Sequence, residues 1–162
     1  MSRIVTFRVP DNQILLAALG RMAIRHSHLD YVLRMSIKTL TGKTVTEGLA
    51  VTKLTQNWRL RRQIDDVATK RFGESSAVLH QLRQLLERAR VATTRRNEML
   101  HELWAQELDG GQFLIGDDKP PRPLPTVDEV DALTDEINTV LTALNSGRLD
   151  RTGFLLVALK VR

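Results

Sequence analysis

Apolar residues recur every three or four positions over long stretches of this chain, and this spacing limits the fold more than any other feature. One stretch runs from Leu15 to Leu40, and others occupy residues 60–72, 78–104 and 130–144. Such spacing places the apolar side chains on one face of a helix. Only 4% of the residues are aromatic, so aliphatic side chains must fill the core. The sequence therefore predicts long amphipathic helices.

Residues that begin or end helices set the expected boundaries. Gly42 and Gly73 follow two of the apolar stretches and are typical C-terminal stops. Thr126 and Glu129 have the spacing of a capping box, in which each side chain bonds a free backbone N–H of the other residue. We expect the main helices over residues 12–42, 57–72, 76–104 and 126–146.

Shorter segments lie between and outside these helices. Residues 3–9 alternate in polarity and predict a strand or an extended arm. Residues 106–108 and 112–115 flank the turn sequence Asp109-Gly110-Gly111 and predict a hairpin. The proline-rich residues 119–125 predict an extended connector, and the apolar residues 154–161 predict either a strand or a buried segment.

Two further features concern the continuity of the helices. Residues 43–55 are rich in Thr and predict a connector with about one helical turn. The Thr93-Thr94 pair is a candidate for a kink in the third helix, because β-branched residues crowd the preceding turn.

The length of 162 residues suits one domain, spanning 1–162, with a real hydrophobic core. We expect an all-α fold: an up-and-down bundle of four to five helices, with a short hairpin and small extended N- and C-terminal segments. The chain has no Cys, which excludes disulfides and thiolate metal sites. It also shows no signal-peptide core and no apolar run of membrane-spanning length, so we expect a cytoplasmic protein without a membrane partner.

The charges are segregated along the chain, although the net charge is only +5. Residues 53–96 contain 11 basic and 4 acidic side chains, whereas residues 97–162 contain 6 basic and 12 acidic ones. A cationic block of this kind can attract a polyanion such as RNA, although a solvated helix surface would have the same composition.

The sequence Arg96-Asn97-Glu98-Met99-Leu100-His101, at the end of this cationic block, contains the predicted catalytic residues. The imidazole of His101 can accept or donate a proton near neutral pH, and the guanidinium of Arg96 can hold phosphate oxygens. Asn97 could orient the imidazole or donate to the phosphate. Cleavage of an RNA phosphodiester by its own 2′-hydroxyl needs these groups and no metal or cofactor.

Such a reaction benefits from both a base and an acid, but the motif supplies one His per chain. We therefore expect a homodimer in which two copies of the motif form one composite site. Arg88, Arg90 and Arg95 are candidate substrate-binding residues, and a solvated helix face is the alternative for each. Asp30, on the first helix, is a candidate supporting residue that would hold Arg96.

A second sequence with the same spacing, Arg21 to His26, lies on the first helix. We reject it as the primary site because Met22, which follows its Arg, belongs to the apolar stripe. His26 and His28 are two residues apart and cannot easily share a metal, so one is expected to pack in the core and the other to face solvent.

At residues 96–101 the chain resembles the HEPN superfamily, whose signature is Arg, a polar residue, three variable residues and His. The resemblance covers residues 12–144, and it implies a helical bundle that acts as a dimeric, metal-independent endoribonuclease. It also implies that Arg96 and His101 are catalytic and that Asn97 is the polar position. Members act in toxin–antitoxin, phage-defence or RNA-processing settings, so a cognate antitoxin is an expected partner.

Two alternatives remain open at this point. In the first, the chain is a non-catalytic dimeric module in which Arg96 and His101 serve packing or ligand binding. In the second, it is a regulator that binds nucleic acid through its Arg-rich helix face, although no helix-turn-helix spacing is found.

Overall fold

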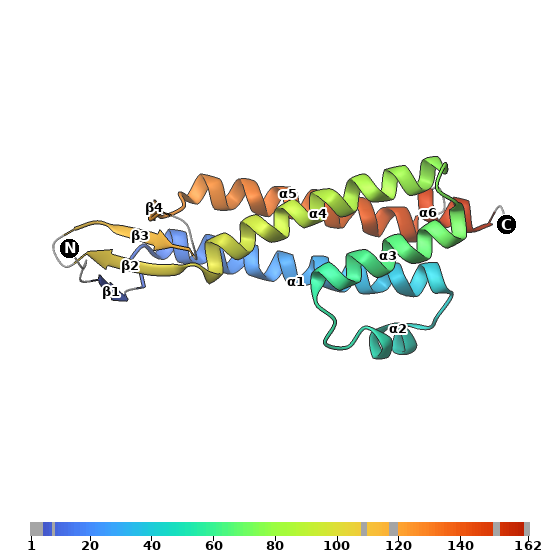
Figure 1. Ribbon diagram of the computed structural model, residues 1–162, viewed down its shortest axis with the longest axis horizontal. Coiled ribbons are helices and arrows are strands. Elements are labelled where there is room, and N and C mark those ends of the chain that lie inside the picture. The colour runs from blue at the N-terminus through green and yellow to red at the C-terminus, as the bar shows by residue number, and fades with distance from the viewer. Residues whose placement is uncertain (1–4, 8, 108–109, 117–119, 151–152, 161–162) are drawn as a thin grey trace.

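The computed structural model describes residues 5–7, 9–107, 110–116, 120–150 and 153–160. Within them the fold is mostly helical, with a small four-stranded antiparallel sheet at one end of an elongated bundle (Figure 1). The elements in order are β1 (Val5–Phe7), α1 (Gln13–Thr41), α2 (Val45–Val51), α3 (Asn57–Phe72), α4 (Ala77–His101), β2 (Leu103–Glu107), β3 (Gln112–Ile115), β4 (Arg122–Pro123), α5 (Val127–Leu149) and α6 (Phe154–Lys160).

The four main helices that the apolar periodicity predicted are confirmed, and so are the residues predicted to begin or end them. Gly42 ends α1 and Gly73 ends α3, both with positive φ, a conformation that costs Gly little. The capping box of Thr126 and Glu129 begins α5. In the predicted connector, Thr44 begins α2 with a capping box of its own. Because these caps satisfy the free N–H groups locally, the starts of α2 and α5 depend little on tertiary contacts.

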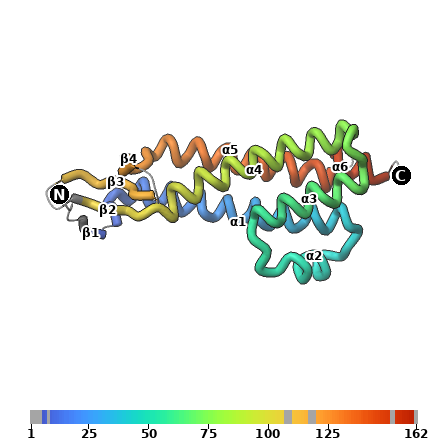
Figure 2. Tube along the Cα trace, in the orientation of Figure 1, coloured from blue at the N-terminus to red at the C-terminus, as the bar shows by residue number. Residues whose placement is uncertain are grey.

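The helices do not follow an up-and-down order. Asp30, near the middle of α1, bonds Asn57 at the start of α3, and the carbonyl of Leu40 near the end of α1 accepts from Arg71. α1 and α3 therefore run in the same direction, since α2 and its loops carry the chain back along the bundle (Figure 2). α4 runs in the opposite direction to both, so the predicted topology is wrong for the first half of the chain.

The sheet also corrects the all-α prediction. Its strand order is β1-β2-β3-β4, with every neighbouring pair antiparallel. The predicted N-terminal strand and the hairpin are confirmed, and β4 adds a short strand from the proline-rich connector. The third helix was expected to continue to Trp104, but α4 ends at His101. Residues 103–106 pair instead with β3 on one side, and Ala105 and Gln106 also pair with β1, which are contacts that local spacing does not reveal.

Two other expectations concern the C-terminal segment and the Thr93-Thr94 pair. The C-terminal segment is the helix α6, so the expected strand or extended segment is wrong, whereas the alternative of a segment buried against the bundle is confirmed: Leu155 is buried, and the ring of Phe154 lies against α5 where Gly147 leaves room for it. α4 passes through Thr93 and Thr94 without a break. The Thr93 hydroxyl donates to the carbonyl of Ala89 at 2.7 Å, a local bond that lets Thr remain inside a helix.

The core lies where α1 packs against α3, α4 and α5. No helix in the described ranges combines the length and the apolar character needed to cross a membrane. A few residues of the predicted segments lie outside the described residues, namely Arg3, Ile4, Arg8, Leu108, Asp109, Lys119 and Val161.

Candidate functional site

The Arg96–His101 motif occupies the last turns of α4, where that helix extends past the start of α3. The Oδ1 atom of Asn57, the first residue of α3, lies 3.3 Å from the hydroxyl of Thr93, which places the start of α3 one turn before the motif. α3 has 16 residues and α4 has 25, so α3 cannot cover the end of α4 (Figure 1). Asn97 and His101 are consequently exposed.

Arg96 contacts both of the other predicted catalytic side chains. Nη1 of Arg96 lies 3.0 Å from Oδ1 of Asn97 and 2.9 Å from Nε2 of His101. A guanidinium can only donate, so Nε2 of His101 accepts and carries a lone pair in this arrangement. The Nε2 lone pair is therefore engaged by the guanidinium, and it becomes free to accept a proton only when Arg96 turns to another acceptor such as a phosphate.

Arg96 also retains an unused donor. Its Nε is buried, and no hydrogen-bond partner for that atom is found in the described part of the chain. A buried N–H without a partner costs about 1–3 kcal/mol and is uncommon in a purely structural side chain. The guanidinium is therefore held in place without being fully satisfied by the protein.

A partly buried polar network lies one turn behind the motif and joins three helices. Nε2 of His26 on α1 lies 3.1 Å from Oγ1 of Thr93 on α4. Because the Thr93 hydroxyl donates to Ala89, His26 is the donor in this bond. Asn57 of α3 donates to Asp30, whose other carboxylate oxygen lies 3.8 Å from Nδ1 of His26. The network fixes α4 against α1 and α3 next to Arg96.

Asp30 was predicted to hold Arg96, but the structure places it in this network. Its contacts are with Asn57 and His26, and within the described residues no hydrogen bond or ion pair joins it to Arg96. Asp30 can therefore act on Arg96 only through the network. A sequence motif could not have selected these partners, because Asn57 is 27 residues away from Asp30.

His26 is buried and its pKa lies below the ordinary value of 6.5. Burial is the main cause, because it disfavours the charged imidazolium. Asp30 opposes the shift, whereas Arg96 and Arg61 add to it through charge repulsion. The charge of Arg96 therefore couples the motif electrostatically to the network around His26.

This shift predicts how the stability of the protein changes with pH. The unfolded chain binds a proton at His26 more tightly than the folded one does, so the free energy of unfolding should fall as pH drops below about 6.5. His26→Gln should remove that part of the pH dependence between pH 7 and pH 5, measured by thermal unfolding. His28→Gln, at an exposed position of the same helix, is the control and should leave the slope unchanged. Equal slopes for the parent protein and His26→Gln would contradict the prediction.

The three arginines predicted to bind substrate do not share one face of α4: Arg88 and Arg95 are seven residues apart on the side that faces α5, whereas Arg90 lies on the side of α3. Arg88 makes a two-pronged ion pair with Glu136 of α5, at 2.8 and 2.9 Å. Arg90 is paired with Glu87 of its own helix. Arg95 is exposed on the side nearer to β4 and the start of α5. No hydrogen bond joins these arginines to the motif within the described residues, so their role in substrate binding stays a prediction.

Arg122 of β4 braces the motif, and the sequence pattern did not reveal it. Its Nε donates to Glu102 at 2.8 Å, and its Nη2 donates to the carbonyl of Glu98 at 3.0 Å. A cation at the C-terminal end of a helix satisfies carbonyls that lack a partner in the helix. Arg122 therefore ties the sheet to the end of α4.

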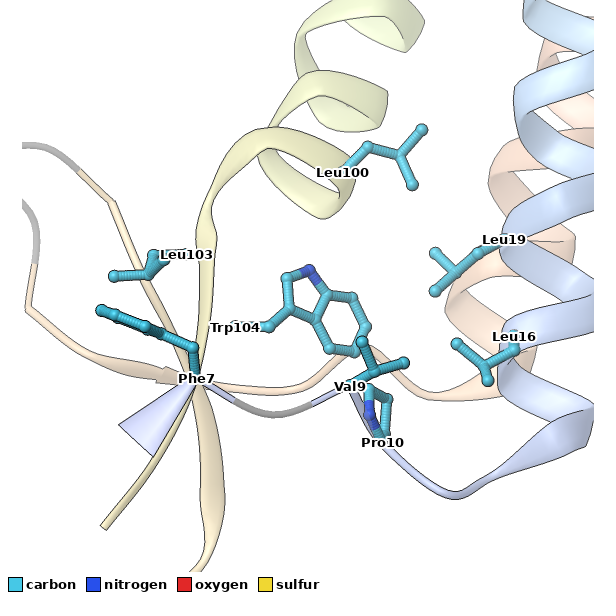
Figure 3. Close-up of a pocket in the computed structure, with 8 residues that line it drawn as sticks. All are labelled: Phe7, Val9, Pro10, Leu16, Leu19, Leu100, Leu103 and Trp104. Carbon is cyan, nitrogen blue, oxygen red and sulfur yellow. The ribbon is translucent and has the colours of Figure 1, made fainter. Parts of the chain in front are cut away.

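An apolar pocket of about 400 Å³ adjoins the motif on the side of the sheet (Figure 3). The indole of Trp104 points toward α1 and donates to the carbonyl of Met99 at 3.1 Å. The side chains of Phe7 and Leu103 lie next to each other, 74% and 44% exposed. The other lining residues are Val9, Pro10, Leu16, Leu19 and Leu100. The pocket exposes apolar surface directly beside His101.

The second Arg-to-His sequence, residues 21–26 of α1, does not form a comparable site. Arg21 is exposed and bonds Asp131 of α5 at 3.1 Å, whereas His26 is buried in the network. The predicted difference between His26 and the exposed His28 is confirmed. In the part of the chain that the structure describes, no three His, Asp or Glu side chains are grouped closely enough to hold a metal ion.

Comparisons of this chain with protein-family models, with curated proteins and with solved structures find no match.

Proposed function

We propose that this protein is a metal-independent endoribonuclease that cleaves single-stranded or loop RNA. The observation that carries the proposal is the contact of 2.9 Å between the guanidinium of Arg96 and Nε2 of His101, on an exposed helix end. The imidazole removes the proton from a ribose 2′-hydroxyl, and the 2′-oxygen attacks the adjacent phosphorus. The bond to the 5′-oxygen breaks, and that oxygen leaves with a proton. The products are a 2′,3′-cyclic phosphate and a 5′-hydroxyl.

Arg96 stabilises the charge that develops during this reaction. A phosphate that enters beside His101 would meet the guanidinium, whose fork matches two phosphate oxygens. Asn97 orients the guanidinium through its Oδ1. The network of His26, Thr93 and Asn57 holds the helices, so these groups do not have to be ordered when the substrate binds.

We extend the proposal to the family and the setting. The motif lies at an exposed helix end in a mostly helical fold, which supports a HEPN-like protein. In that case the protein would act on RNA in the cytoplasm, as a toxin or a phage-defence effector, and a cognate antitoxin could bind it. Toxicity on expression in bacteria, compared with that of a His101→Ala variant, tests this setting.

Incubation of the purified protein with single-stranded RNA in excess EDTA tests the chemistry. We expect fragments with 2′,3′-cyclic phosphate and 5′-hydroxyl ends, identified by mass spectrometry. The same sequence made with 2′-O-methyl groups should stay intact, because it has no 2′-hydroxyl to attack. Fragments with 5′-phosphate ends, or cleavage only when divalent metal is added, would overturn the mechanism.

The proposed reaction also requires a second imidazole, which a twofold dimer supplies. Phe7, Val9 and Leu103 expose 74%, 69% and 44% of their surface beside the motif. Exposed apolar groups of this size that adjoin one another are typical of an interaction surface. We propose that a second copy of this chain covers them and places its own His101 opposite the first.

Phe7→Glu tests the dimer. Burying one Phe side chain contributes about 1.5–3 kcal/mol, and a twofold interface contains it twice, so the dimer dissociation constant should rise at least tenfold. Sedimentation equilibrium over a range of protein concentrations measures this change. Val157→Glu is the control because Val157 is an exposed apolar residue of α6, at the opposite end of the bundle (Figure 1). An unchanged dissociation constant for Phe7→Glu would exclude this surface as the interface.

A further inference from the structure

One face of α4 carries a continuous row of polar side chains that leads to the proposed active site. The helical period of 3.6 residues places positions 3, 4 and 7 apart on the same face. By this rule the row consists of Arg83, Glu87, Arg90, Thr94, Asn97 and His101. The row is about 27 Å long, from 18 residues at a rise of 1.5 Å each. It ends at the exposed His101 and begins beside α3.

α3 forms the other side of this path. A cavity of about 410 Å³ lies between the two helices, and Arg61, Arg62 and Asp65 line it from α3. Arg83, Leu86, Glu87 and Arg90 line it from α4. We call this cavity the α3–α4 groove. It contains four guanidinium groups and two carboxylates, so its lining carries a formal charge of +2.

The acidic side chains neutralise only part of the groove. Arg83 is held by Asp65 and Glu74, and Arg90 is held by Glu87. Arg61 has a buried Nη1 with no hydrogen-bond partner in the described residues, and burial followed by repulsion from Arg90 lowers its pKa. Arg62 is exposed, and the described part of the chain provides no hydrogen bond or ion pair for it. Arg62 is therefore open to an anion, and the half-buried Arg61 is a second cation of the groove that no carboxylate neutralises by a hydrogen bond within the described residues.

An exposed tryptophan lies one turn closer to the motif. Trp58 is three and four residues before Arg61 and Arg62, which places it on the same face of α3. It is 49% exposed, its Nε1 donates to Gln56 at 2.7 Å, and the guanidinium of Arg59 lies 5.0 Å from its ring centre. An exposed aromatic ring beside a cationic groove is the usual arrangement for binding single-stranded nucleic acid, in which bases stack and phosphates pair with cations.

We propose that the α3–α4 groove binds single-stranded RNA on one side of the scissile phosphate, with Arg61 and Arg62 on the phosphates and a base stacked on Trp58. This inference rests on the proposed ribonuclease function. Arg90 and His101 are about 16 Å apart along α4, from eleven residues at 1.5 Å each, so only RNA longer than a dinucleotide reaches both. Unpaired RNA fits better than a duplex, because a base that is already stacked and paired cannot lie on Trp58.

RNA binding without cleavage tests the groove directly. The probe is a fluorescent single-stranded RNA of about twelve nucleotides, within the usual site size, and the protein is His101→Ala so that the probe stays intact. In that background, Trp58→Ala should raise the dissociation constant about tenfold, and Trp58→Phe should restore most of the loss. Arg62→Ala should raise it and reduce the slope of log K against log salt by about 0.7. Arg25→Ala, an exposed arginine of α1 outside the groove, is the matched control.

The outcomes separate this inference from the proposed function. If Trp58→Ala and Arg62→Ala lose RNA binding but the parent protein never cleaves RNA, the groove binds RNA and the proposed nuclease function is wrong. If the parent protein cleaves RNA, but Trp58→Ala and Arg62→Ala bind RNA as tightly as Arg25→Ala does, the proposed role of the groove is wrong and the nuclease proposal stands. Where cleavage occurs, Trp58→Ala should lower the ratio of kcat/KM for long RNA to kcat/KM for a dinucleotide about tenfold. An unchanged ratio would contradict RNA binding in the groove.

Discussion

Replacing His101 with alanine is expected to lower the rate of RNA cleavage by about 10²–10⁴-fold, the usual contribution of a general acid or base. The side chain is exposed at the end of α4, so its removal should leave the fold intact. The measurement is single-turnover cleavage of a fluorescent RNA in EDTA, with circular dichroism and analytical ultracentrifugation to show that helix content and the proposed dimer are retained.

A histidine outside the motif controls for this result. His80 is exposed near the start of α4, far along the helix from the motif, and His80→Ala should cleave RNA at the parent rate. Comparable losses in His80→Ala and His101→Ala would show that the activity does not depend on the motif. Full activity in His101→Ala would refute the proposed mechanism.

Arg96→Ala is the second change with a large expected effect. Loss of one donor that stabilises transition-state charge usually lowers kcat about 10²–10³-fold. Arg96→Lys should recover little of this loss, because an ammonium group cannot hold two phosphate oxygens in the fixed fork of a guanidinium. Arg21→Ala is the control, because Arg21 begins the second Arg-to-His sequence, residues 21–26, and this variant should cleave RNA at the parent rate.

The structure provides an independent readout for Arg96. Its charge helps to lower the pKa of the buried His26, after the larger effect of burial. In Arg96→Ala the pKa of His26 should therefore rise toward 6.5, which NMR titration of the imidazole can follow. Unfolding would also raise this pKa, so the variant must keep the circular dichroism and thermal unfolding of the parent protein. In a variant that does, a rise accompanied by lost cleavage would show that the guanidinium occupies the described position. An unchanged pKa would contradict that position.

Local chemistry was enough to predict the long helices and the residues of the motif. Thr126 and Glu129 satisfy the start of α5 with their own side chains, and the glycines 42 and 73 adopt positive φ where α1 and α3 end. The contact between Arg96 and His101 is also local, because both lie on one helix five residues apart. Interactions of this range are encoded in neighbouring residues, so the sequence specifies them.

Other parts of the site depend on pairing between distant segments. Asp30 was assigned to Arg96 because few acidic residues lie on the first helix, yet Asn57 of α3 is its hydrogen-bond partner. Arg122 was not recognised at all, since β4 brings it to Glu98 and Glu102 across about twenty residues of sheet and connector. Trp58 was also missed, because a single exposed aromatic residue acquires meaning only when α3 lies beside α4.

The sequence by itself determined the four main helices, because helix formation and capping depend on residues within one or two turns, and it singled out the six residues of the proposed chemistry. The tertiary structure decided that α1 and α3 run in the same direction and that β2 replaces the end of the third helix. It also decided that Asn97 and His101 are left exposed beyond the start of α3. These features arise from contacts between residues far apart in the chain, whose free energy depends on how whole elements pack and not on any local pattern.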